Sequence, residues 1–149
     1  MAAFSKMTTY RKVLYVLSII LLVLAIIYLG LGIIALAVGS TSLISDAQLS
    51  QIAAAADMDG REALQLGAGI MIVYGVWEAL VSILGIRGAK NPHKMGLVTV
   101  IYGIEAAIVV CGLVVTLFTG NFTTDQFQGL LAIAAFFICL MVRKEARES

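Results

Sequence analysis

The chain has 149 residues, of which 61% are hydrophobic and only 13% charged, and its formal net charge is +1. Soluble domains average about half apolar and about a quarter charged residues, so this composition excludes an ordinary soluble domain and indicates an integral membrane protein. Spans of roughly 20 residues take up most of such a chain and leave little room for a separate catalytic module. The basic residues lie beside apolar segments, which argues against nucleic acid as a partner.

Four apolar segments predict an all-α, four-helix bundle in the membrane as a single domain, with spans at about residues 13–38, 62–86, 95–118 and 126–143. Ser45 followed by Gln48 has the spacing of a capping box, which predicts a short amphipathic helix on the membrane surface in the first outer loop. The second span is expected to end at Arg87 and Gly88. A polar turn containing Pro92, which cannot continue a helix, then leads into the third span.

Two further capping patterns mark helix starts. Asp59 with Glu62 predicts that the second helix begins near Arg61, and Thr123 with Gln126 predicts the start of the fourth. All three patterns therefore agree with the positions of the apolar segments.

The distribution of Lys and Arg predicts the orientation. Three lie in the N-terminal arm, three in the turn between the second and third spans, three in the C-terminal tail, and one in the first long loop. Because positive residues accumulate on the cytoplasmic side of a membrane, both termini are expected in the cytoplasm. We therefore expect a multi-pass protein of the plasma (cytoplasmic) membrane.

Two acidic residues inside the predicted spans, Glu78 and Glu105, are the main candidates for a functional site. A carboxylate in a span costs at least about 2.5 kcal/mol unless it is neutralised, paired or hydrated. On antiparallel neighbouring helices both lie roughly 13 to 16 Å from the inner boundary, near the bilayer midplane. Each has a tyrosine close by on the same helix, Tyr74 and Tyr102 respectively.

Two interpretations of these acids stay open. In the functional one, the two carboxyls form a shared proton or cation site in the membrane. In the structural one, each carboxyl is neutral and hydrogen-bonds a tyrosine or a backbone carbonyl, which holds helices together.

Small residues at helical spacing form a second signal, since such stripes let helix backbones approach closely. The candidates for helix packing are Tyr28, Gly32, Ala35, Gly39, Gly75, Ala79, Gly103 and Ala107. Packing within the four-helix bundle is the preferred interpretation, and packing between protomers is the alternative.

No pattern in the sequence indicates catalysis or cofactor binding. Cys111 and Cys139 lie in apolar segments without a metal-ligand spacing, so we expect small apolar fillers, no metal site and no disulfide. His93 lies in the cytoplasmic turn and is given no role. No catalytic residue and no cofactor is assigned, and the protein is not expected to be an enzyme.

The layout resembles a small tetraspanin-like protein, with four spans, a short cytoplasmic turn after the second, and an acid in the third at Glu105. The segment 84–91 is similar to the glycine-rich end of the second tetraspanin span and the turn after it. Ile86 and Arg87 stand where the family has paired cysteines, the large outer loop is reduced to about 119–126, and its Cys-Cys-Gly motif is absent. The resemblance implies a non-catalytic membrane organiser that associates laterally.

These patterns lead to two functional hypotheses. The first is a non-catalytic integral membrane protein that self-associates or organises other membrane proteins through lateral helix packing, with the lipid bilayer as its environment. The alternative is an oligomeric channel or small proton- or cation-coupled transporter that uses Glu78 and Glu105.

Overall fold

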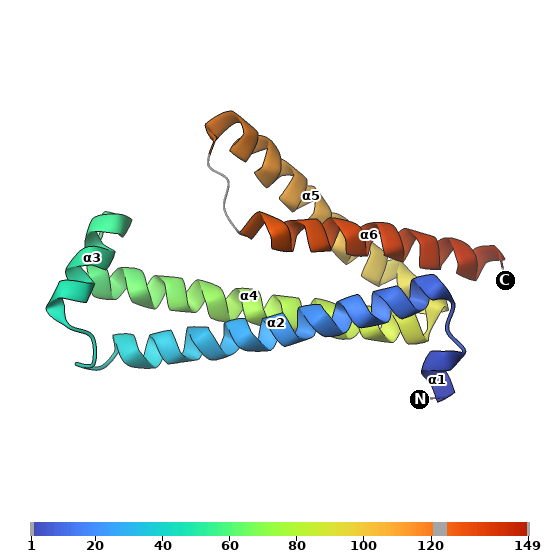
Figure 1. Ribbon diagram of the computed structural model, residues 1–149, viewed down its shortest axis with the longest axis horizontal. Coiled ribbons are helices and arrows are strands. Elements are labelled where there is room, and N and C mark those ends of the chain that lie inside the picture. The colour runs from blue at the N-terminus through green and yellow to red at the C-terminus, as the bar shows by residue number, and fades with distance from the viewer. Residues whose placement is uncertain (1, 121–124, 149) are drawn as a thin grey trace. The chain divides into compact units, whose positions relative to one another are not determined.

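A computed structural model of the chain describes residues 2–120 and 125–148, and the regular structure in these ranges is helical (Figure 1). The elements in chain order are α1 (Ala2–Ser5), α2 (Thr9–Gly39), α3 (Asp46–Ala56), α4 (Gly60–Lys90), the 3-10 helix η1 (Pro92–Lys94), α5 (Met95–Thr119) and α6 (Asp125–Glu148). The all-α prediction is confirmed for this part of the chain.

Three segments in the described ranges are long and apolar enough to cross a membrane: α2, α4, and η1 together with α5. The predicted spans 13–38, 62–86 and 95–118 fall within these three segments. The predicted span 126–143 falls within α6, which continues as a helix to Glu148, beyond the basic residues Arg143 and Lys144.

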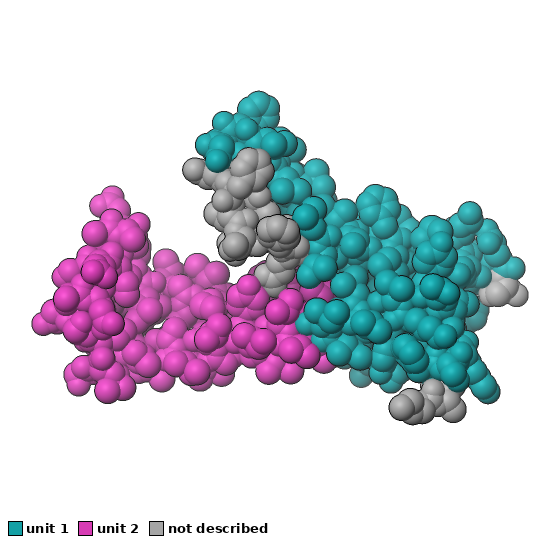
Figure 2. Space-filling view, in the orientation of Figure 1, with its two compact units in different colours: residues 1–20, 81–149 teal, residues 21–80 magenta. Residues whose placement is uncertain are grey.

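The chain divides into two compact units, and both α2 and α4 contribute to each (Figure 2). Unit 2 comprises residues 21–80, in which the second part of α2 packs against the first part of α4. The contact is close at two glycines: Gly32 approaches the backbone of α4 at Ala68, and Gly75 approaches the backbone of α2 at Ala25. Because glycine has no side chain, the two helix backbones can lie close together at these positions in unit 2.

Unit 1 comprises residues 1–20 and 81–149, and its buried residues come from α2, α4, α5 and α6. Within this unit, α5 and α6 pack against each other. Between residues 129 and 148 of α6, the buried residues recur every three or four positions, as expected for one helix face: Ala132, Ala135, Cys139 and Val142. The buried residues of α5 are Met95, Val98, Thr99, Tyr102, Glu105 and Ala106. All of them lie in the first half of that helix.

The predicted starts of α3 and α4 are confirmed. Ser45 and Gln48 form a complete capping box at the start of α3. The Asp59 carboxylate accepts hydrogen bonds from the backbone N–H groups of Arg61, at 3.0 Å, and Glu62, at 3.2 Å, which caps α4. The predicted capping pattern of Thr123 lies outside the described residues.

The predicted end of α4 at Arg87 and Gly88 is wrong, because the helix continues to Lys90. Gly88 is buried against the side chain of Met95 on α5, a position in which glycine fits because it has no Cβ. The Arg11 guanidinium, from α2, donates hydrogen bonds to the carbonyls of Ala89, at 2.7 Å, and Lys90, at 2.8 Å. These contacts satisfy the last carbonyls of α4, and the helix ends two residues beyond Gly88.

Candidate functional site

Glu78 lies on the buried side of α4 in unit 2, where its side chain is only 7% exposed. The Tyr74 hydroxyl, one turn earlier, donates a hydrogen bond of 2.8 Å to Glu78 Oε1. Oε2 of the same carboxyl has no hydrogen-bond partner among the described residues. The carboxyl is therefore buried with a hydrogen bond to only one of its two oxygens among the described residues.

Glu105 lies on the buried face of α5 in unit 1, where it is 9% exposed. Tyr102, the tyrosine expected near it, is fully buried on the same face. The two candidate acids thus belong to different units, Glu78 to unit 2 and Glu105 to unit 1. Each is described within its own unit, and a site shared by both carboxyls stays a prediction.

The candidate packing residues of unit 2 lie along the contact between α2 and α4. A Cβ on Gly32 would lie 2.8 Å from Ile72 Cγ1, and a Cβ on Gly75 would lie 2.8 Å from Leu29 Cγ. Beside this contact, the rings of Tyr28 and Tyr74 meet edge to face with centroids 5.7 Å apart.

The remaining candidates differ in their surroundings. In unit 2, a Cβ on Gly39 would lie 2.9 Å from the side chain of Leu64. In unit 1, a Cβ on Gly103 would lie 3.0 Å from the Phe136 ring of α6. Ala35 and Ala79 are half-buried, whereas Ala107 is exposed. Most of the candidates therefore pack inside the chain, and Ala107 is directed outward.

Unit 1 also contains a small buried polar group that was not predicted from the sequence. Ser18 on α2 and Ser82 on α4 are fully buried, and neither hydroxyl has a hydrogen-bond partner among the described residues. Gly85 lies against the Ser18 hydroxyl, and a Cβ there would be 2.9 Å from the Tyr102 hydroxyl oxygen. A serine within the long apolar segment of the first span was the available signal for this group.

Most residues in the second half of α5 are exposed, and the contact with α6 there includes Val109, which lies against Gly129. Ala107, Cys111 and Gly112 are exposed, and the exposed fraction reaches 87% at Phe118 near the helix end. A Cβ on Gly112 would meet nothing within 4 Å. Cys139, by contrast, is buried on α6. The expectation of an apolar filler therefore fits Cys139, while Cys111 lies on the exposed surface.

Within residues 2–120 and 125–148 no group of three or more His, Cys, Asp or Glu side chains is arranged to hold a metal ion. No family model, no curated protein and no solved structure matches the chain. The geometry of the chain itself therefore has to support any assignment of function.

Proposed function

We propose that this protein is a non-catalytic membrane protein of four spans that self-associates laterally through the second half of α5. The observation that carries the proposal is that only the first half of α5 contains buried residues. Its buried residues end at Ala106, whereas the following apolar turns up to Thr119 are exposed or half-buried. A resemblance to tetraspanin-like organisers agrees with a function in lateral association.

The four-span topology is supported by α6, which packs antiparallel to α5 and ends in basic residues. If α6 crosses the bilayer, Arg143, Lys144 and Arg147 lie on the same side as the basic turn after α4. Lys and Arg side chains extend far enough to reach the headgroup region from the end of a short span. Both termini then lie in the cytoplasm.

Cysteine labelling tests this topology. In a Cys111→Ser, Cys139→Ser background, a membrane-impermeant maleimide is expected to label Leu43→Cys from outside intact cells, and to label His93→Cys and Glu148→Cys only after permeabilisation. Leu43 and His93 are both exposed, so accessibility within the protein does not limit the reaction. Labelling of Glu148→Cys from the outside would show that α6 does not cross and would overturn the four-span proposal.

Self-association through α5 is supported by the residues on its exposed half. Ala107, Cys111 and Gly112 are small, so a second α5 can approach the backbone closely here, and such close packing contributes to affinity between helices in lipid. Gly112 has open space around it, so its small size is not needed for packing within the described chain.

A matched pair of glycine substitutions tests self-association. Gly96 also lies on α5 and also has open space around its Cβ position, but it belongs to the half that packs against α6. We expect Gly112→Ile to lower the dimer fraction in bilayers by at least about fivefold, and Gly96→Ile to leave it unchanged. The measurement is the dimer fraction in liposomes at fixed protein-to-lipid ratios.

Copper-phenanthroline oxidation provides an independent readout of the same contact. A dimer linked through Cys111, which is exposed, is expected from wild-type protein and from Cys139→Ser, and no linked dimer is expected from Cys111→Ser. A wild-type protein that stays monomeric in bilayers, or equal dimer fractions for Gly112→Ile and Gly96→Ile, would contradict the proposal.

The buried carboxyl of Glu78 favours a second candidate function, an oligomeric channel or proton- or cation-coupled transporter. Its Oε2 atom is buried and lacks a hydrogen-bond partner among the described residues, so it has an acceptor available for a proton or cation. Proton or cation flux into liposomes tests this candidate. The candidate requires flux in the wild type that is lost in Glu78→Gln. A wild-type protein without flux would exclude the channel or transporter function.

A further inference from the structure

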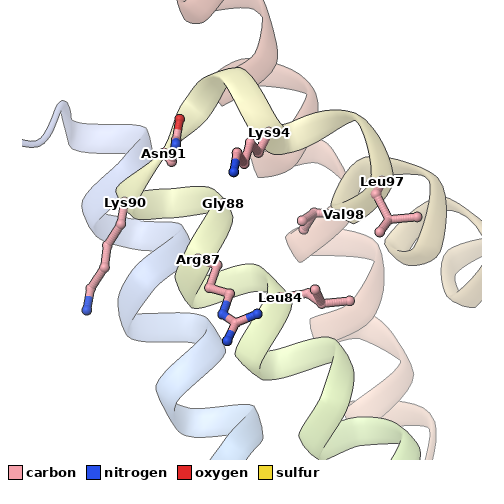
Figure 3. Close-up of a pocket in the computed structure, with 8 residues that line it drawn as sticks. All are labelled: Leu84, Arg87, Gly88, Lys90, Asn91, Lys94, Leu97 and Val98. Carbon is pink, nitrogen blue, oxygen red and sulfur yellow. The ribbon is translucent and has the colours of Figure 1, made fainter.

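A cavity of about 450 Å³ lies at the α4–α5 turn of unit 1 (Figure 3). Its lining combines basic, amide and apolar groups: Leu84, Arg87, Gly88, Lys90, Asn91, Lys94, Leu97 and Val98. It has no acidic lining residue. The cavity lies between the end of one membrane-capable segment, α4, and the beginning of the next, η1 with α5.

The three basic residues at the cavity are not equivalent. The Lys90 ammonium lies over the ring of Tyr15, 5.6 Å from its centroid, and in Figure 3 its side chain extends away from Leu84 and Leu97. Arg87 and Lys94 have no carboxylate partner in the described part of the chain. The cavity therefore presents two cations whose charge no neighbouring acid compensates.

The helix ends around the cavity also suit an anion. The last carbonyls of α4, at Ala89 and Lys90, are occupied by the Arg11 guanidinium, which offsets the negative end of the helix dipole. On the other side, α5 begins at Met95 after Lys94, whose side chain forms no cap. The positive end of the α5 dipole thus adds to the potential of Arg87 and Lys94.

The apolar part of the lining distinguishes a lipid from a soluble anion. Leu97 is 61% exposed and, with Leu84 and Val98, forms an apolar wall directly beside the cations. Inorganic phosphate gains nothing from such a wall, whereas a phospholipid places acyl chains next to its phosphate. Basic pockets between membrane helices on the cytoplasmic side are suited to anionic headgroups.

We propose that the cavity at the α4–α5 turn binds the phosphate headgroup of an anionic phospholipid, with Arg87 and Lys94 as its cationic ligands and Leu84 and Leu97 against the acyl chains. Arg87 supplies a planar pair of donors for phosphate oxygens, and Lys94 adds a second charge. The site lies at the cytoplasmic face in the topology proposed above, but its chemistry does not require self-association.

Native mass spectrometry of the protein in detergent, titrated with phosphatidylglycerol, tests this site. Removing one cation is expected to weaken retention about fivefold, and the double variant Arg87→Gln, Lys94→Gln should weaken it more than either single variant. Lys144→Gln is the matched control, because it removes one cation from an exposed part of α6 outside the cavity. Phosphatidylcholine, which has no net charge, is expected to be retained weakly and equally by all variants.

The outcomes separate the possible ligands. Loss of phosphatidylglycerol in the Arg87 and Lys94 variants but not in Lys144→Gln supports the proposal. Equal loss in Lys144→Gln, or displacement of the lipid by inorganic phosphate at low millimolar concentration, overturns it. Lys94→Gln alone, at an exposed position, provides the result if the double variant does not fold. Since binding is measured in detergent on the monomer, the result does not depend on the topology or on the α5 contact.

Discussion

Replacing Gly75 with valine is expected to destabilise the protein by about 1 to 3 kcal/mol, because the new side chain would push apart two helix backbones. A Cβ on Gly75 would lie 3.1 Å from both the Ala25 carbonyl oxygen and the Leu29 nitrogen of α2. Both are backbone atoms, which cannot move aside by a change of rotamer. Valine adds two methyl groups beyond this Cβ and makes the overlap worse.

Gly32 should behave in the same way from the opposite helix. A Cβ there would lie 3.1 Å from the Ala68 carbonyl oxygen and 3.2 Å from the Ile72 nitrogen of α4. Because both glycines serve one contact between α2 and α4, the two valine substitutions together should cost less than the sum of their separate effects.

Each helix provides its own control for this prediction. Gly30 on α2 and Gly69 on α4 have nothing within 4 Å of their Cβ positions, so valine there should change the unfolding free energy by less than about 0.5 kcal/mol. The measurement is reversible unfolding by SDS in mixed micelles. If Gly75→Val proves as stable as Gly69→Val, the close contact in unit 2 is wrong.

Because Gly32 takes part in this contact, a substitution there does not test self-association between two copies of the chain. In the sequence, Gly32 and Ala107 look alike, since both are small residues on apolar helices. In the structure, Gly32 lies against α4 within the chain, whereas Ala107 is exposed. A bulky residue at Gly32 therefore tests the packing of the chain itself, and self-association is better tested on α5.

The parts of the fold that the sequence predicts well are those controlled by neighbouring residues. The start of α3 depends on Ser45 and Gln48, three positions apart, and the start of α4 depends on Asp59. The end of α4 depends on Arg11, which is distant in the sequence and satisfies the helix carbonyls. No local pattern around Gly88 contains that information, so the helix was predicted to end too early.

The candidate site shows the same limit. Spacing along α4 places Tyr74 one turn from Glu78, and the hydrogen bond between them follows from that spacing. The cavity at the α4–α5 turn combines Arg87 with Lys94 and Leu97 across a change of helix, so it depends on the angle between two elements. The basic residues there were recognised from the sequence only as a signal for topology.

Loss of the Tyr74 hydroxyl is expected to be the most costly polar deletion in unit 2. Tyr74→Phe keeps the ring and its edge-to-face contact with Tyr28, and it removes the donor to Glu78 Oε1. Since Oε2 already has no hydrogen-bond partner among the described residues, the buried carboxyl would lose its side-chain donor as well. The expected loss of stability is about 1 to 3 kcal/mol.

A double-mutant cycle shows whether this loss comes from the hydrogen bond. Glu78→Leu removes both carboxyl oxygens and leaves an apolar group of similar size, so it should cost less than Tyr74→Phe. In the Glu78→Leu background, Tyr74→Phe should have almost no further effect, because the acceptor is gone. Tyr15→Phe is the control, since the ring of Tyr15 contacts Phe4 and Lys90 and its hydroxyl lies outside unit 2.

The same cycle bears on the choice between the two proposed functions. If Glu78 has only a structural role, Glu78→Leu retains stability and dimerisation, and neither it nor the wild type conducts protons or cations in liposomes. If Glu78 is a transport site, Glu78→Leu is stable but abolishes a flux that the wild type possesses. Additive costs for Tyr74→Phe and Glu78→Leu would contradict the hydrogen bond itself, because two groups that interact directly cannot contribute independently.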